Sequence, residues 1–274
     1  MRSRIAFGVI GFAFVLCALF ILPPIVLEIA LVLLCGLAAW EITVPTGLVR
    51  DRDVAVLCTL IAVGFGWNAT NGMHTSAYRE ICALGLLLIA VVGLFAVLLR
   101  RHDTMHFHQI ACGLFGSVLL PYLLLALMRI FQMEKGRYLV LLPLLAAWGS
   151  DTFAYFAGRF FGKHKLAPVI SPKKTIEGAV GGVLGGSVCV LIFTVILDLT
   201  LGFALPYWAA AVLGAIGAAI GQIGDLSFSV IKRQTGIKDY GHIFPGHGGV
   251  LDRFDSVIFV APVVELVLRA VGVS

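Results

Sequence analysis

One stretch of the sequence, residues 238–256, combines acidic, basic and glycine residues and reads KDYGHIFPGHGGVLDRFDS. Asp252 and Asp255 are hard oxygen ligands of the kind that bind Mg²⁺, and neighbouring cations can bind phosphate groups. The glycines of PGHGG allow the backbone to approach a ligand closely. This pattern is typical of a magnesium–polyphosphate site, and a solvated interfacial loop is the alternative. The cations around it are Lys232, Arg233, Lys238 and Arg253.

Two further acids, Asp151 and Asp225, lie inside long apolar segments. An unpaired charge at such a depth costs at least ~2.5–3.5 kcal/mol, so a functional role is the first hypothesis. At helical spacing, Asp225 shares one face with Ser229 and Lys232. The alternative for Asp151 is a pair with Arg159 that braces the helices. The alternative for Asp225 is an acid that is hydrogen-bonded inside the bundle.

A third group of charges lies in the segment APVISPKKTIEG, residues 167–178. Lys173 and Lys174 come just before a helix that we expect to begin near residues 175–177. The free N–H groups and the dipole of a helix N-terminus attract a phosphate, and two ammonium groups add to that attraction. The segment therefore predicts a phosphate site, with the ordinary positive-inside signal of membrane proteins as the alternative.

The elements that must hold these residues are membrane helices. Hydrophobic residues make up 60% of the chain and charged residues 13%, with a mean hydropathy of +1.02, whereas globular chains carry about 25% charged residues. Many apolar runs are close to the roughly 20 residues that a helix needs to cross the hydrocarbon core. The strands of a membrane β-barrel are shorter, so runs of this length exclude a barrel fold. The predicted fold is an all-α, polytopic bundle of about nine transmembrane helices, or eight without the short third one. The nine segments are 5–22, 25–44, 54–68, 81–99, 110–130, 138–160, 177–200, 207–230 and 254–272.

The distribution of Lys and Arg predicts the orientation of the bundle. With the N-terminus in the cytosol, 15 of the 20 basic residues fall in cytosolic segments. This places residues 238–256 at the cytosolic face of the cell (inner) membrane. The first apolar run has no small-residue cleavage site, so we expect a retained helix and not a signal peptide. The five basic residues on the opposite side are Arg79, Arg129, Lys135, Arg137 and Arg269.

The two halves of this single predicted membrane domain differ in composition. Residues 1–137 are mostly aliphatic and aromatic, with Glu28 and Glu41 near the ends of one segment, and their role stays unassigned. Residues 138–274 gather polar residues and are expected to be the catalytic half. The six cysteines are scattered singly, so we expect neither disulfides nor a thiolate metal site. Glycines four apart allow close helix packing, within one chain or in a homodimer; they are Gly178, Gly182, Gly186, Gly217 and Gly221.

Residues 229–255, SVIKRQTGIKDYGHIFPGHGGVLDRFD, resemble the signature of the phosphatidate cytidylyltransferases, also called CDP-diacylglycerol synthases. That signature is S-x-x-K-R, four residues, K-D-x-G, three residues, P-x-H-G-G, two residues and D-R-x-D, and every fixed position is matched. The upstream stretch SDTFAYFAGRFFGKHKLAPVISPKKTIEG is similar to a second characteristic region of the family. Phe228 stands where many members have Glu, so the role of that Glu is not transferred to this chain.

The resemblance implies that CTP and phosphatidate react to CDP-diacylglycerol and pyrophosphate, with Mg²⁺ as cofactor and room for a second cation. The lipid phosphate can itself attack the α-phosphorus, so catalysis would consist of positioning and charge neutralisation. Membrane lipids are further expected partners, and nucleic acid is not expected. The implied catalytic residues are Asp225, Asp252, Lys232, Arg233, Lys238, Asp239, His247 and Arg253. The implied substrate-binding residues are Asp151, Arg159, Ser171, Lys173, Lys174, Gly248 and Gly249, and the implied metal ligands are Asp225, Asp252 and Asp255.

The most specific expectation concerns the metal. Asp225 and Asp252 are 27 residues apart on antiparallel segments, and we expect their carboxylates to meet at one depth and hold one Mg²⁺. His247 is expected to hydrogen-bond the triphosphate. Two other functions stay open. One is a CTP-using lipid kinase, which would transfer the γ-phosphoryl group. The other is a transporter, which intramembrane acids and glycine-rich helices also fit.

Overall fold

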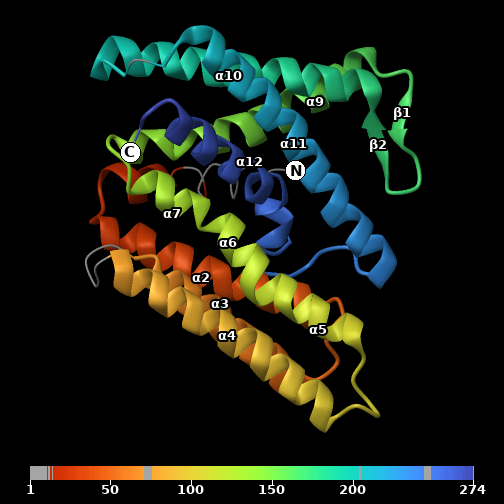
Figure 1. Ribbon diagram of the computed structural model, residues 1–274. Coiled ribbons are helices and arrows are strands. Elements are labelled where there is room, and N and C mark those ends of the chain that lie inside the picture. Colours follow the sequence, from red (N-terminus) through yellow and green to blue (C-terminus); the bar gives the residue numbers. More distant parts are fainter. Residues whose placement is uncertain are drawn as a thin grey trace. The chain divides into compact units, whose positions relative to one another are not determined.

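The computed structural model describes residues 11, 13, 15–70, 76–203, 205–243 and 248–273, most of which are helical (Figure 1). The chain divides into two compact units. Unit 1 consists of Met1–Met128 and Gln234–Arg253, and unit 2 of Arg129–Arg233 and Phe254–Ser274. The stretch 238–256 is thus divided, because its first 16 residues cluster with the N-terminal helices. Of the predicted first segment, 5–22, residues 5–10, 12 and 14 lie outside the described residues.

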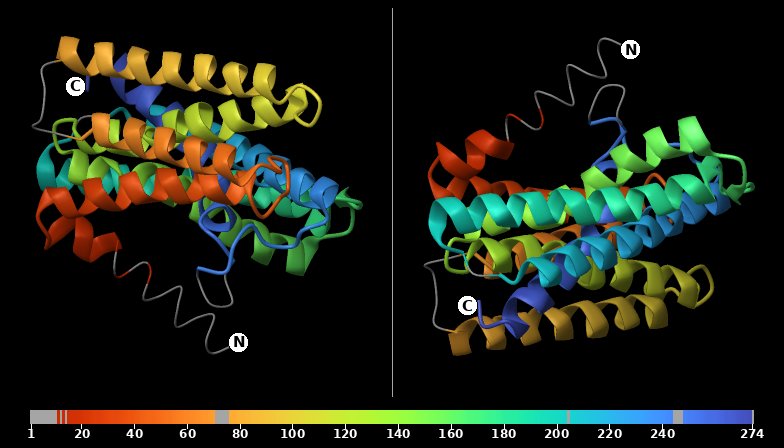
Figure 2. Two further views of the ribbon diagram at one scale, coloured as in Figure 1. Left: turned by 90° about the horizontal axis from the view of Figure 1, so that it is seen from below. Right: turned by 90° about the horizontal axis from the view of Figure 1, so that it is seen from above.

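Unit 1 contains three long helices, α2 (Pro24–Thr43), α3 (Arg52–Asn68) and α4 (Ser76–Arg100). They pack side by side in Figures 1 and 2. Asp51 caps α3, because its side chain accepts a hydrogen bond from the Asp53 N–H at 3.0 Å. Apolar side chains cover much of the outward surface of α4, as on a helix that faces lipid.

A broken helix follows in unit 1. It comprises α5 (Phe107–Leu114), a π-helical turn η1 (Phe115–Leu119), α6 (Leu120–Leu124) and the start of α7 (Ala126–Phe131). Pro121 lacks the N–H that a regular helix would use, and the π-helical turn before it is of the single-turn kind that occurs inside α-helices. Gly116 lies in the π-turn against α2, where a Cβ would come 2.7 Å from Ile42 Cγ2. The small residue therefore permits the close packing of this helix on α2.

Unit 2 contains α8 (Gly136–Leu139), α9 (Leu141–Phe161), a hairpin of β1 (Lys165–Ala167) and β2 (Ser171–Thr175), α10 (Ile176–Leu201), and most of α11 (Tyr207–Thr235) and α12 (Leu251–Ala270). The helices α9 and α10 run alongside each other and are joined at one end by the hairpin (Figures 1 and 2). The hairpin departs from the sequence prediction, which treated this segment as a loop in an all-α protein. Two strands of three and five residues are too short for a clear period-two pattern.

Glycines set the distances between the helices of unit 2, as their four-residue spacing predicts. A Cβ at Gly182 would lie 2.8 Å from Gln222 Nε2, and one at Gly186 would lie 2.7 Å from Ala218 Cβ. On α11, a Cβ at Gly221 would lie 2.9 Å from Val260 Cγ2. These separations are too short for an ordinary side chain, so the glycines allow α9, α10, α11 and α12 to approach closely.

Six helices in the described part of the chain are long and apolar enough to cross a membrane. They are Pro24–Thr43, Ala77–Arg100, Phe107–Phe131, Gly136–Phe161, Ile176–Leu201 and Tyr207–Thr235. The chain is therefore a helical, polytopic membrane protein. Two more of the predicted segments are helical but fall outside this set, α3 with 17 residues and α12 with several charges. The count of nine, the cytosolic N-terminus and the division near residue 137 stay predictions.

Candidate active site

The hairpin of unit 2 is fastened to the start of α10. Thr175 is the N-cap of α10, and its Oγ1 accepts a hydrogen bond from the Gly178 N–H at 3.1 Å. Glu177 accepts hydrogen bonds from the Lys163 N–H at 3.1 Å and from the His164 ring at 2.7 Å. The prediction that a helix begins at residues 175–177 is confirmed. Lys173 and Lys174, which precede this helix, lie on strand β2.

Lys173 and Lys174 differ because successive side chains of a strand point to opposite faces. Lys173 is exposed. Lys174 forms an ion pair with Asp225, with 2.5 Å between Nζ and Oδ2, and both side chains are about three-quarters buried. The predicted phosphate-binding lysine and the predicted metal-binding acid are thus in direct contact in unit 2.

Asp225 has further polar neighbours. Ser229, one turn along α11, donates a hydrogen bond from Oγ to Asp225 Oδ1 at 3.3 Å, which confirms that the two share a face. Asp255 of α12 is close enough to Asp225 and Asp151 for their charges to repel, and it is attracted by Lys232. We call Asp151, Lys174, Asp225, Lys232 and Asp255 the Asp225 cluster. It unites residues from β2, α9, α11 and α12 within unit 2.

The other predicted residues of unit 2 lie around this cluster or on its elements. Arg159 donates a hydrogen bond to the Tyr155 hydroxyl at 3.0 Å on α9. Arg233 donates from Nε to the Ile170 carbonyl at 3.2 Å, which links the end of α11 to the hairpin turn. Ser171 begins β2 and is half-buried.

The Asp225 cluster fits a magnesium ion by the chemistry of its donors. Mg²⁺ is bound in proteins by one or two carboxylates, with water and substrate phosphates as its remaining ligands. Asp225 and Asp255 supply two carboxylates, and the ammonium group of Lys174 already balances part of their charge. Within the described residues, no group of three or more His, Cys, Asp or Glu side chains could hold a metal ion.

In unit 1, Asp252 contacts backbone groups. Asp252 lies in the first turn of α12, and its Oδ2 accepts hydrogen bonds from the N–H groups of Tyr240, at 2.7 Å, and Gly249, at 2.9 Å. Gly248 has a φ of +82°, and a Cβ there would come 2.5 Å from Asp252 Oδ2, so this turn requires glycine. Lys238 and Arg253 are exposed and Asp239 is half-buried. His247 lies outside the described residues.

Glu41 of α2 is a residue that the sequence analysis left without a role. It is buried, with 2% of its surface exposed, and its two oxygens accept hydrogen bonds from the N–H groups of Val250, at 2.9 Å, and Leu251, at 2.8 Å. These donors begin α12 and follow the glycines of the signature. One sequence feature could have indicated a role for Glu41: it is an acid in an apolar segment, and no basic residue lies within one helical turn of it.

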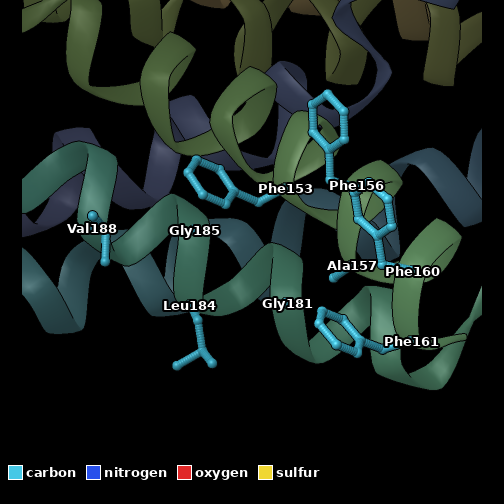
Figure 3. A pocket seen from close by; sticks show the side chains of 9 residues that line it. All are labelled: Phe153, Phe156, Ala157, Phe160, Phe161, Gly181, Leu184, Gly185 and Val188. Carbon is cyan, nitrogen blue, oxygen red and sulfur yellow. The ribbon is translucent and has the colours of Figure 1, made fainter.

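An apolar groove lies on another face of unit 2, between α9 and α10 (Figure 3). Its volume is about 350 Å³, and only apolar side chains and glycines line it. Phe153, Phe156, Phe160 and Phe161 come from α9, and Leu184 and Val188 from α10. The Phe153 ring fills the space that a Cβ at Gly185 would need. This surface suits hydrocarbon and offers no group for a phosphate.

Comparisons with known proteins show the family to which the chain is similar. Residues 2–271 match the profile of a family described as the cytidylyltransferase family. Similar curated proteins are the phosphatidate cytidylyltransferases of Staphylococcus saprophyticus, 45% identical over 135 residues, and Staphylococcus haemolyticus, 47% identical over 135 residues. The protein of that name from Staphylococcus aureus is 45% identical over 135 residues. Each alignment covers 49% of this chain and 50% of the relative, so the chain spans about half the length of the curated relatives it matches.

Proposed function

The chain belongs to the cytidylyltransferase family, and from this premise we propose that it transfers the cytidylyl group of CTP to phosphatidate in phospholipid biosynthesis. The products are CDP-diacylglycerol and pyrophosphate. The observation that carries the proposal is the Asp225 cluster, in which carboxylates and ammonium groups converge from four elements of unit 2. Matched acids and cations of this kind are what a triphosphate and a metal need.

The reaction needs no protein nucleophile. An oxygen of the phosphatidate phosphate forms a bond to the α-phosphorus of CTP, and the bond from that phosphorus to the oxygen bridging to the β-phosphorus breaks. Phosphatidate is already ionised at neutral pH, so no group of the protein must remove a proton. The protein's contribution is to hold the two phosphates in line and to neutralise their charge.

The cations of the chain divide into two groups in this proposal. Lys173 and Lys174 of β2 bind phosphate groups of one substrate. The second group binds those of the other substrate and consists of Lys232, Arg233, Lys238 and Arg253. His247 is proposed to hydrogen-bond the triphosphate.

Asp225 and Asp255 are the proposed magnesium ligands of unit 2, and Asp252 is kept as the third predicted ligand. The ion would supply positive charge to the phosphates of CTP. Ser229 supports this role of Asp225, because its hydroxyl orients one carboxylate oxygen. The cytosolic orientation is proposed because CTP is a soluble cytosolic nucleotide. Reporter domains fused after residues 135 and 170 should then lie on opposite sides of the membrane.

CTP labelled at either the α- or the γ-phosphorus tests the proposed reaction. Membranes that contain the protein are incubated with phosphatidate and each labelled nucleotide, and the lipids are extracted. We expect the α-label in lipid and the γ-label in pyrophosphate. The γ-label in lipid would identify a lipid kinase, and no label in lipid would favour a transporter. A homodimer is tested in the same preparation by the mass of the purified protein in detergent.

A further inference from the structure

We propose that Glu41, on the N-terminal helix α2, is a positioning residue for the active site: its carboxylate sets the backbone that carries Asp252. This inference rests on the proposed function and assigns a role in it to the N-terminal part of the chain. Glu41 itself touches backbone N–H groups and glycines, so it acts through the loop of unit 1.

The hydrogen bonds of Glu41 fix the start of α12. Its Oε1 accepts from the Val250 N–H and its Oε2 from the Leu251 N–H, across 209 and 210 residues of sequence. The first N–H groups of a helix have no partner within the helix, and the N-terminal end of its dipole attracts negative charge. A carboxylate offers two acceptor oxygens and a charge, which suits both properties.

The burial of Glu41 shows that these contacts are needed. An acid with 2% of its surface exposed is tolerated only when hydrogen bonds replace its lost hydration. Both oxygens obtain such a bond from the loop. Two glycines leave the space for the carboxylate, because a Cβ at Gly241 or at Gly249 would overlap Glu41 Oε1. These two glycines of the signature are therefore explained by Glu41.

The loop passes this constraint to Asp252. The N–H of Gly249 donates to Asp252 Oδ2 at 2.9 Å, and the next two N–H groups along the chain donate to Glu41. Three successive backbone amides are thus held by two acids, one from α2 and one from α12. A change in the position of Glu41 moves the backbone of residues 249–251 and with it the carboxylate of Asp252.

Substitutions at Glu41 separate the charge from the shape of the side chain. Glu41→Gln keeps one acceptor oxygen but turns an NH₂ group toward one of the two donors. Glu41→Ala removes both acceptors. Loss of a hydrogen bond to a charged group changes an equilibrium or rate constant by roughly 10- to 100-fold. We therefore expect kcat/KM to fall by that factor in Glu41→Gln and by more in Glu41→Ala. Glu41→Asp, which keeps the charge, should recover part of the loss.

Hydrogen exchange at backbone amides provides a second measurement that needs no substrate. We expect the amides of Val250 and Leu251 to exchange at least about tenfold faster in Glu41→Gln, because each loses or weakens its acceptor. Glu28→Gln is the matched control, since Glu28 is on the same helix and equally buried, with 3% exposed. It lies 13 residues away, about 20 Å along the helix. The control should leave exchange at Val250 and Leu251 unchanged.

Three results would overturn the inference. One is unchanged exchange at Val250 and Leu251 in Glu41→Gln, and another is faster exchange with wild-type kcat/KM. The third is an equal loss of kcat/KM in Glu28→Gln, which would indicate a general effect on α2. If the wild-type protein transferred no α-label to lipid, the proposed function would fail, while the exchange measurement would still decide whether Glu41 holds the loop.

Discussion

Glu41 and Asp252 of unit 1 have a different kind of partner from Asp225 of unit 2. In unit 1, Glu41 and Asp252 accept hydrogen bonds from backbone N–H groups. In unit 2, Asp225 contacts the side chains of Lys174 and Ser229, with Asp255 nearby. A backbone amide cannot leave its partner unless the loop unfolds, whereas a lysine side chain can rotate away. Glu41 and Asp252 therefore hold a loop, whereas Asp225 has a cationic partner that a ligand could replace.

The largest effect is expected for Asp225→Asn. This change keeps the shape of the side chain but removes the charge that pairs with Lys174 and that a metal requires. We expect turnover to fall by more than about 100-fold, while the amount of protein inserted in the membrane stays normal. Ser227→Ala, on the same helix, is the control, because the Ser227 hydroxyl donates a hydrogen bond to the Ile223 carbonyl of its own helix. Near-normal turnover of Asp225→Asn at limiting Mg²⁺ would contradict a role in metal binding.

Asp252→Asn sharpens the comparison, since Asp252 is both a predicted metal ligand and an acceptor for backbone amides. Asparagine can replace the accepting oxygen but not the charge. We expect turnover to fall by more than about 100-fold here too, measured as a function of Mg²⁺ concentration. A loss of only a few fold, independent of Mg²⁺, would show that Asp252 shapes the loop and does not bind metal.

Gly249→Ala should disturb unit 1 through space alone. The new Cβ would overlap the carboxylate of Glu41, and overpacking of a buried position costs about 1–3 kcal/mol. We expect a lower thermal midpoint in detergent and at least a tenfold loss of kcat/KM. Gly85→Ala is the control, because a Cβ at Gly85 meets nothing within 4 Å. Equal effects of the two substitutions would argue against a tight contact between Glu41 and the loop.

Lys174→Met and Lys173→Met test the difference between two neighbouring lysines of β2. Lys174 balances the charge of Asp225, so its loss leaves two repelling carboxylates, whereas Lys173 is exposed. We expect kcat/KM to fall about tenfold or more for Lys174→Met and clearly less for Lys173→Met. Steady-state kinetics with varied CTP and varied phosphatidate measure both. The reverse order would place the phosphate site on the exposed face of the strand.

Thr175→Ala is expected to have the smallest effect. It removes the N-cap of α10, which is worth about 1 kcal/mol of stability, and leaves the charged groups in place. The thermal midpoint in detergent should fall by a few degrees, with little change in kcat. Thr200→Ala, at the exposed other end of the same helix, should leave the midpoint unchanged. A large loss of kcat in Thr175→Ala would show that the hairpin must be held rigidly for catalysis.

The sequence by itself determined the elements whose signals are local. Apolar runs of about 20 residues predict membrane helices, because the thickness of the hydrocarbon core sets that length. The start of α10 follows from a capping threonine, and the close packing of α10 and α11 from glycines four apart. The shared face of Asp225 and Ser229 follows from helical geometry alone.

Only the tertiary structure decided which distant groups meet. The pairing of Lys174 with Asp225 spans 51 residues, and the contact of Glu41 with Leu251 spans 210. A sequence pattern shows that a buried acid needs a partner, but it cannot show whether that partner is a lysine, a metal or a backbone amide. That choice depends on how the helices pack, because packing alone brings the carboxylate of α2 to the first turn of α12.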